Sequence, residues 1–88
     1  MPLTYTITIS NSALKELHGL QKAIVKKIEK SIDSLGQNPR PVGVKKLKGN
    51  NENLYRIRCG DYRVIYSIND EIRIVDIRRI GHRKDIYK

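Results

Sequence analysis

The sequence predicts an α+β fold: an N-terminal strand, an αα-hairpin and then an antiparallel β-meander, with the helices packed on one face of the sheet. Alternating apolar residues over Thr4–Ile9 indicate the first strand, and apolar residues three and four apart over residues 20–35 indicate a helix. After residue 53, three segments rich in isoleucine, valine and tyrosine are separated by short polar turns. A chain of 88 residues has the usual length of one domain, so we expect a single domain over residues 1–88.

Two helices are expected after the first strand. Ser10-Asn11-Ser12 supplies side chains that cap helix N-termini, and two leucines three residues apart follow, so a short helix should end near His18-Gly19. The second helix should run from about Leu20 to Leu35, because Gly36 and the prolines after it prevent its continuation. Each helix has one apolar side, which favours a helical hairpin that buries this side.

The meander follows a loop. From Gln37 to Asn53 the chain is rich in proline, glycine and asparagine, which predicts irregular structure. Two later dipeptides, Gly60-Asp61 and Asn69-Asp70, are typical of two-residue turns between antiparallel strands. The three strands are therefore expected at about Leu54–Cys59, Tyr62–Ile68 and Glu71–Ile80.

The first hairpin of the meander gathers arginines on one face. With Gly60-Asp61 as the turn, Arg58 lies opposite Arg63, and Arg56 points to the same side because strand side chains alternate. Like charges that face each other across a sheet are destabilising by up to about 1 kcal/mol. We therefore expect an anion between them, and phosphate fits best because guanidinium binds it through two hydrogen bonds.

A second explanation for Arg63 needs no ligand. A two-residue turn at Asn69-Asp70 would place Asp76 opposite Arg63, where the carboxylate would neutralise the guanidinium, and would bring Arg78 to the same face. Both explanations stay open at this point. The C-terminal tail adds further side chains near this region: Arg83, Lys84 and Tyr87.

Composition favours an acidic partner in the cytoplasm. The chain has 18 Lys and Arg against 9 Asp and Glu, a net charge of +9, so a nucleic acid or an acidic protein is expected to bind it. No apolar segment approaches the ~20 residues that span a bilayer, and no secretory signal is visible, so no membrane association is expected. The single cysteine, Cys59, fits a reducing compartment and falls on the apolar side of its strand. With two histidines and no known ligand spacing, neither a metal nor a cofactor is expected.

The chain also resembles a known family. Leu54–Tyr66 and Ile80–Tyr87 together are similar to the signature of the RelE/ParE superfamily, the toxins of bacterial and archaeal type II toxin–antitoxin pairs. Lys46–Gly49 and the strand–helix–helix start fit as well, and the RelE branch fits best. The resemblance implies a RelE-like fold and a metal-independent endoribonuclease that enters the ribosomal A site and cleaves mRNA there by attack of the ribose 2′-OH. It also implies a cognate antitoxin with the role of RelB.

The resemblance assigns site residues as well. The basic residues of the first meander strand fall at Arg56 and Arg58, where the best-known RelE enzymes have lysines. The arginine after the turn is Arg63, that of the Gly-His-Arg segment is Arg83, and the C-terminal tyrosine is Tyr87, although the tail is slightly shorter here. Contacts to RNA are expected from further basic residues: Lys45, Lys46, Lys48, Arg78 and Lys84.

This chemistry needs a base for the 2′-OH, an acid for the leaving 5′ oxygen, and positive charge on the phosphorane. Arginine cannot be the base, because its pKa exceeds about 12. We therefore expect a clamp on the phosphate from Arg56, Arg58 and Arg63, with Arg83 as a further clamp or as the group that orients the leaving oxygen. Tyr87 and His82 are the candidates for proton transfer. Tyr87 would otherwise stack on a base or anchor the C-terminus, and His82 would otherwise be a turn residue.

Two other functions stay open. The first is a toxin of the ParE branch, which shares the fold but acts on DNA gyrase and cuts no RNA; the full set of arginines argues against it. The second is a basic module that binds RNA or an acidic protein without chemistry. Loss of cleavage with binding retained, on substituting Arg63 or Arg83, would distinguish an enzyme from such a module.

Overall fold

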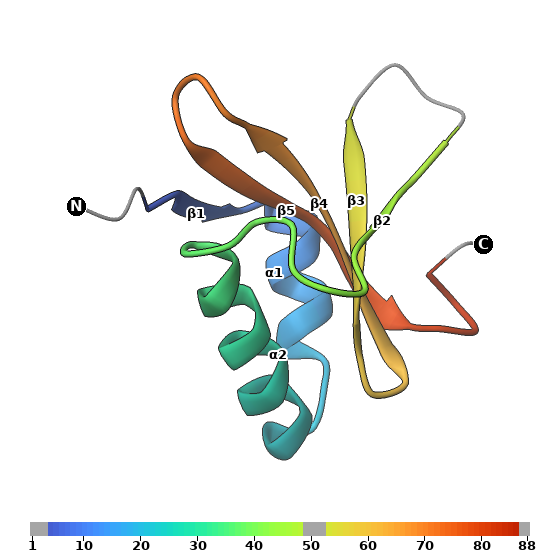
Figure 1. The fold of residues 1–88 in the computed structure, drawn as a ribbon. Coiled ribbons are helices and arrows are strands. Elements are labelled where there is room, and N and C mark those ends of the chain that lie inside the picture. The colour runs from blue at the N-terminus through green and yellow to red at the C-terminus, as the bar shows by residue number, and fades with distance from the viewer. Residues whose placement is uncertain (1–3, 49–52, 87–88) are drawn as a thin grey trace.

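The computed structural model describes residues 4–48 and 53–86, and it has the α+β architecture that the sequence predicts. Its elements in chain order are β1 (Thr6–Ile9), α1 (Asn11–His18), α2 (Lys22–Leu35), β2 (Lys45–Lys46), β3 (Leu54–Cys59), β4 (Tyr62–Asn69) and β5 (Ile74–His82). One sheet has the order β1-β5-β4-β3-β2, in which β1 runs parallel to β5 and the other neighbours are antiparallel. Both helices lie on the same face of this sheet (Figure 1). In the described part of the chain, neither helix is long and apolar enough to cross a membrane.

The helices begin and end where local chemistry dictates. Ser10 caps α1, because its Oγ accepts a hydrogen bond from the amide of Ala13 at 3.1 Å. The second helix begins two residues later than expected, at Lys22, and ends at Leu35, with Gly36 as its C-cap. A side chain at Gly36 would place its Cβ 3.2 Å from the carbonyl oxygen of Tyr5, a tight contact, so glycine at this position favours the close approach of the chain before β1 to the end of α2.

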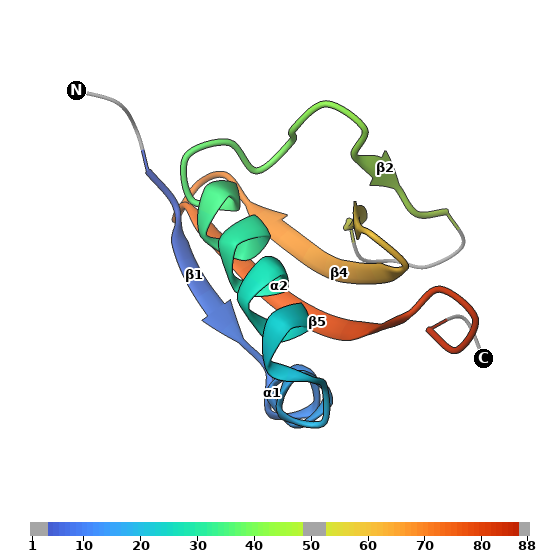
Figure 2. The same cartoon turned by 90° about the horizontal axis from the view of Figure 1, so that it is seen from below.

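The core lies between the helices and the sheet. Its buried members come from every one of these elements except β1 and β2: Ala13, Leu17, Ile28, Ile32, Leu35, Ile57, Val64, Tyr66, Val75, Ile77 and Ile80. Cys59 packs against this cluster, as expected from its side of β3. Figure 2 shows α2 lying across the sheet and α1 beside β1 and β5. The face of the sheet turned away from the helices is therefore the one that carries the arginines of β3 and β4.

The turn between β4 and β5 is longer than predicted. Strand β4 continues to Asn69 and β5 begins at Ile74, so the chain reverses over four residues and not over Asn69-Asp70. The Oδ1 of Asn69 accepts hydrogen bonds from the amides of Glu71 and Ile72 at 3.0 and 3.2 Å, which stabilises this wider turn. At its end Arg73 has a φ of 54°.

The longer turn changes the register of β5. Asp76 pairs with Ser67 and not with Arg63, whose partner is Gly81. The expectation that Asp76 neutralises Arg63 is therefore wrong. The carboxylate of Asp76 binds Arg78 at 2.9 Å and accepts a hydrogen bond from the hydroxyl of Thr8 at 2.8 Å.

A salt bridge fixes the loop after α2 to the β4–β5 turn. The guanidinium of Arg40 donates two hydrogen bonds to Asp70, at 3.1 and 2.9 Å, and the hydroxyl of Tyr5 donates a third at 2.6 Å. These bonds lower the pKa of Asp70 to about 2, and those from Arg40 have a larger effect than the one from Tyr5. The same loop is held by Tyr66, whose buried hydroxyl donates to the carbonyl of Pro39 at 2.7 Å.

We expect the Asp70 carboxylate to make stability depend on acid pH. Its pKa is depressed in the fold, so its contribution is fully present above the unfolded value near ~4 and is lost as the pH falls towards 2. In Asp70→Asn, the melting temperature should be lower at pH 7 and should fall less steeply between pH 4 and 2 than in the wild type. Thermal unfolding followed by circular dichroism tests this. The matched control is Asp33→Asn on α2, which removes the same charge; equal acid sensitivity of Asp70→Asn and the wild type would contradict the assignment.

Candidate functional site

The hairpin of β3 and β4 has the predicted register. Arg58 lies opposite Arg63, and Arg56 lies opposite Ile65. Gly60 has a φ of 61°, which a two-residue turn of this kind requires at its first position. Because their neighbours Ile57 and Val64 belong to the core, the three arginines share the face away from the helices.

Arg63 is the most constrained of these arginines. It is only 8% exposed, and its Nη1 donates hydrogen bonds to the carbonyl oxygens of Gly60 and Tyr62 at 3.0 and 2.9 Å. These partners are neutral, so they fix the guanidinium without cancelling its charge. Arg58, directly opposite, is exposed. The pair thus combines a rigid buried cation with a cation that solvent reaches, and an anion between them would relieve their repulsion.

A second row of side chains extends this basic face. Lys45 of β2 lies opposite Arg56, so the two-residue strand adds a lysine beside the arginines. The sequence predicted only a loop here. Lys46, Lys48 and Lys84, for which RNA contacts are predicted, are exposed. Arg78 forms an ion pair with Asp76, so its guanidinium is less available to bind RNA than the prediction assumed.

The end of β5 and the following turn lie beside the β3–β4 turn (Figure 1). The amide of Arg83 donates to the carbonyl of Asp61 at 2.8 Å, and its side chain approaches the Asp61 carboxylate at 3.8 Å. Two segments that are far apart in sequence thus meet next to Arg63. This places Arg83 at the margin of the arginine face, as the sequence predicted.

His82 occupies a different side. It pairs with Tyr62, and their rings meet edge to face at 5.4 Å, so strand alternation puts it with the core-side residues. Its Nδ1 accepts the amide of Lys84 at 3.1 Å, which leaves the neutral ring's proton on Nε2. The structure therefore does not bring His82 onto the face of Arg56, Arg58 and Arg63. Tyr87 lies outside the described residues.

A small apolar patch also lies on the arginine face, and of its two residues sequence reasoning missed Ile86. Ile65 and Ile86 are buried but stand outside the helix-side core. Ile86 packs over Gly81, where a Cβ would lie 3.4 Å from its Cδ1 atom. Because Gly81 is the partner of Arg63, the turn after β5 folds back beside that arginine. The available signal in the sequence was Ile86 itself, an apolar residue near the end of a polar C-terminal tail.

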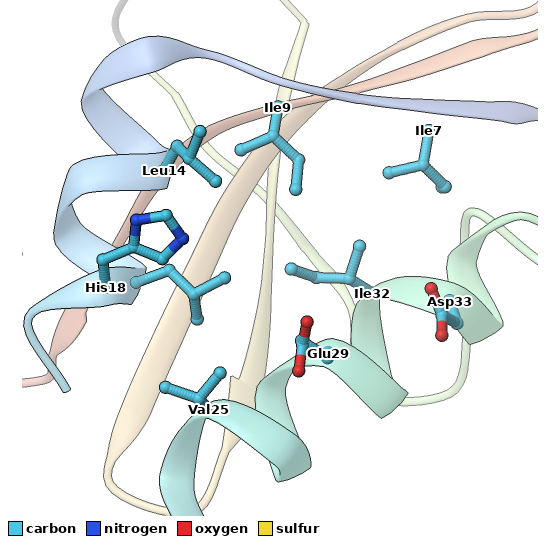
Figure 3. A pocket seen from close by; sticks show the side chains of 9 residues that line it. Ile7, Ile9, Leu14, His18, Val25, Glu29, Ile32 and Asp33 are labelled. Atoms are coloured by element: carbon cyan, nitrogen blue, oxygen red, sulfur yellow. The ribbon is translucent and has the colours of Figure 1, made fainter. Parts of the chain in front are cut away.

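A cavity of about 550 Å³ lies elsewhere, between β1, α1 and α2 (Figure 3). Six apolar and three titratable residues line it: Ile7, Ile9, Leu14, Leu17, His18, Val25, Glu29, Ile32 and Asp33. It is on the helix side of the sheet, so it cannot hold a phosphate between Arg58 and Arg63. His18, which lines this cavity, therefore lies on the opposite side of the sheet from the arginine face.

Comparison with known proteins identifies the family. Residues 7–87 match the family model described as the ParE toxin of the type II toxin–antitoxin system parDE. The chain belongs to this family of toxins. A Methanocaldococcus jannaschii protein named putative toxin RelE1 is 36% identical over 89 residues, covering 98% of both chains. Toxin RelG of Mycobacterium tuberculosis is 34% identical, covering 98% of this chain and 99% of its own.

Solved structures agree with this assignment. The RelE–RelB complex of Pyrococcus horikoshii OT3 contains a chain with a TM-score of 0.81 and 36% identity, covering 93% of this chain and 98% of that one. The RelE-like fold and the resemblance to RelE toxins are thus confirmed. The family model carries the ParE description, whereas these relatives carry RelE names. The chain is a RelE-like toxin of a toxin–antitoxin system.

Proposed function

We propose that this RelE-like toxin is a metal-independent endoribonuclease that cleaves mRNA in the ribosomal A site and so inhibits translation. The observation that carries the proposal is the cross-strand pair of Arg58 and Arg63, a rigid cation beside an exposed one with neutral groups as the described partners of Arg63. Such a pair fits a charge that grows during reaction, as on a phosphorane. The RelE names of the relatives support the same activity.

In the proposed reaction the ribose 2′-oxygen attacks the adjacent phosphorus and the bond from phosphorus to the 5′ oxygen breaks. The products are a 2′,3′-cyclic phosphate and a 5′-hydroxyl. The described hydrogen bonds of Arg63 both leave from Nη1, so Nη2 and Nε would bind the phosphate oxygens, with Arg58 and Arg56 completing the clamp. Arg83, held at the turn by Asp61, would bind the phosphate or orient the leaving oxygen.

Two proton transfers remain, and arginine performs neither of them. We propose Tyr87, the C-terminal tyrosine that the resemblance assigns to the site, as the base for the 2′-OH. A phenolate is favoured by nearby guanidinium groups. His82 keeps Nε2 as a donor, but its place on the core side of β5 makes it the weaker candidate for the acid.

The missing strong base makes positioning by the ribosome the expected source of most of the rate. Cleavage of ribosome-bound mRNA should exceed cleavage of the same free RNA by at least about 10³-fold, because holding the 2′-oxygen in line with the leaving oxygen removes much of the entropic barrier. Primer extension on both substrates at equal concentration measures the ratio. Comparable rates on the two substrates would argue against ribosome dependence.

The basic surface should make ribosome binding sensitive to salt. Lys45, Lys46, Lys48 and Lys84 are exposed and would contact RNA phosphates, so affinity should fall steeply as salt rises.

The ParE description of the family model favours one other function, action on DNA gyrase without RNA cleavage. On induction in cells, arrest of translation supports the ribonuclease, whereas an early block of DNA replication with mRNA intact supports the gyrase toxin.

An antitoxin with the role of RelB is the second proposed partner, alongside the ribosome carrying A-site mRNA. The P. horikoshii structure is a RelE–RelB complex, and the structures with similar chains include the intact RelBE complex of E. coli. We expect co-expression of a small adjacent reading frame with an acidic product to restore growth of cells that express this toxin. The control is the same frame with an early stop codon. Equal toxicity with both frames would contradict this pairing.

A further inference from the structure

Helix α1 completes an edge of β5 that β1 leaves open. The last β1 pair joins Ile9 and Ile77, and beyond it the β5 backbone would face solvent. The amide of Ser10 donates to the carbonyl of Ile77 at 2.9 Å, and the hydroxyl of Ser10 donates to the carbonyl of Arg78 at 3.2 Å. Glu16, further along α1, accepts the amide of Ile80 at 3.1 Å. Side chains at the start of α1 and within it thus take the place of a neighbouring strand.

Glu16 holds the residues that follow a register shift. Strand β5 pairs Ile77 with Tyr66 but Arg79 with Ile65, so one extra residue is inserted between them. Both carboxylate oxygens of Glu16 accept hydrogen bonds from the guanidinium of Arg79 at 3.2 Å. The same carboxylate therefore binds the side chain of Arg79 and the amide of the next residue, immediately after the bulge.

This bulge decides what faces Arg63. With it, Gly81 lies opposite Arg63, and the amide of Arg83 reaches the carbonyl of Asp61. An uninterrupted ladder continuing from the pair of Tyr66 and Ile77 would place Ile80 opposite Arg63 instead. A slip of one residue moves every side chain to the other face, so Ile80 would leave the core and Arg83 would leave its position at the turn.

We propose that Glu16 is a positioning residue for the arginine site: by anchoring β5 after the bulge, it fixes Arg83 against the β3–β4 turn. The burial of Ile77 and Ile80 on the same side also favours the bulge. Glu16 therefore refines the placement of Arg83 and does not create the strand. The kinetic part of this inference rests on the proposed nuclease function, whereas the structural part does not.

The test compares three variants of the full chain. Glu16→Ala removes both interactions. Glu16→Gln keeps an oxygen that can accept the Ile80 amide, and Arg79→Ala removes only the ion pair. Glu29→Ala is the matched control, because it removes a carboxylate from the surface of α2. Amide hydrogen exchange by NMR reports local anchoring. Single-turnover cleavage at several ribosome concentrations separates the rate constant of cleavage from the ribosome concentration at half-saturation.

We expect Glu16→Ala to speed exchange of the Ile80 and Arg83 amides while the β1–β5 amide of Thr8 exchanges as in the wild type. Its cleavage rate constant should fall about tenfold with half-saturation within about twofold, since a small misplacement of a catalytic group is costly. Glu16→Gln should recover most of the rate, and Glu29→Ala should match the wild type. Unchanged exchange at Arg83, or faster exchange throughout the sheet, would overturn the positioning role. A wild type that cleaves nothing would instead overturn the proposed function, while selective exchange would still support the anchoring by Glu16.

Discussion

Replacing Arg63 by alanine is expected to lower the rate of mRNA cleavage on ribosomes by about 10²–10³-fold, with little change in ribosome affinity. The guanidinium is held by two carbonyl oxygens before substrate arrives, so its charge needs no reorganisation during reaction. Removing one such preorganised donor from the site of a developing oxyanion typically costs this much. Single-turnover cleavage at saturating and subsaturating ribosome concentrations separates the two quantities.

The control for Arg63→Ala must remove a positive charge without touching the site. Arg73→Asn does this at the opposite end of β4 and β5, and asparagine tolerates the φ of 54° found there. Arg63→Lys keeps the charge but not the planar fork, so it should recover only part of the rate. Because Arg63 is nearly buried, melting temperatures of all three variants are needed. Cleavage at the wild-type rate by a folded Arg63→Ala protein would disprove the phosphate clamp.

The largest expected effect on stability comes from Tyr66. Its ring is fully buried between sheet and helices, and its hydroxyl donates to the carbonyl of Pro39 at 2.7 Å. Tyr66→Ala should lower the free energy of unfolding by about 3–5 kcal/mol through the cavity it leaves. A domain of this size has only about 5–15 kcal/mol in total, so the variant should be close to unfolded at 37 °C. Urea unfolding followed by circular dichroism measures the loss.

Tyr66→Phe separates the hydroxyl from the ring. Phenylalanine fills the same volume but leaves the Pro39 carbonyl without its described donor, which should cost about 1–3 kcal/mol. The difference between the two variants is then the contribution of ring packing. If the phenylalanine protein were as stable as the wild type, the bond to Pro39 would have no part in holding the loop after α2.

The arginine hairpin could be predicted in detail because its turn is local. Gly60 adopts a positive φ at no steric cost, and a two-residue turn leaves only one register for β3 and β4. That register alone places Arg58 opposite Arg63. The signature of the family lies in the same stretch, which is why the amino-acid sequence is sufficient to reveal the resemblance to RelE toxins. The order of strand, helical hairpin and meander follows equally from local periodicity.

The β4–β5 hairpin could not be predicted in the same way. Asn69-Asp70 is typical of a tight turn, but Asn69 instead caps a wider one with its side chain, and Asp70 is drawn into contact with Arg40. Local propensity favoured one turn, and contacts from elsewhere in the chain favoured another. The wider turn places Asp76 opposite Ser67 and away from Arg63. The described hydrogen-bond partners of Arg63 are instead two neutral carbonyl groups.

The sequence by itself determined the fold class, the family and the pairing of arginines on one hairpin, since each depends on residues close together along the chain. Tertiary structure alone decided which of those arginines is buried, that His82 faces the core side, and that β5 is bulged and anchored by Glu16. These features join residues from distant parts of the chain, or depend on a bulge that the packing of Ile77 and Ile80 favours. A short stretch of sequence cannot reveal the energies of such contacts, because these contacts form only when the chain folds.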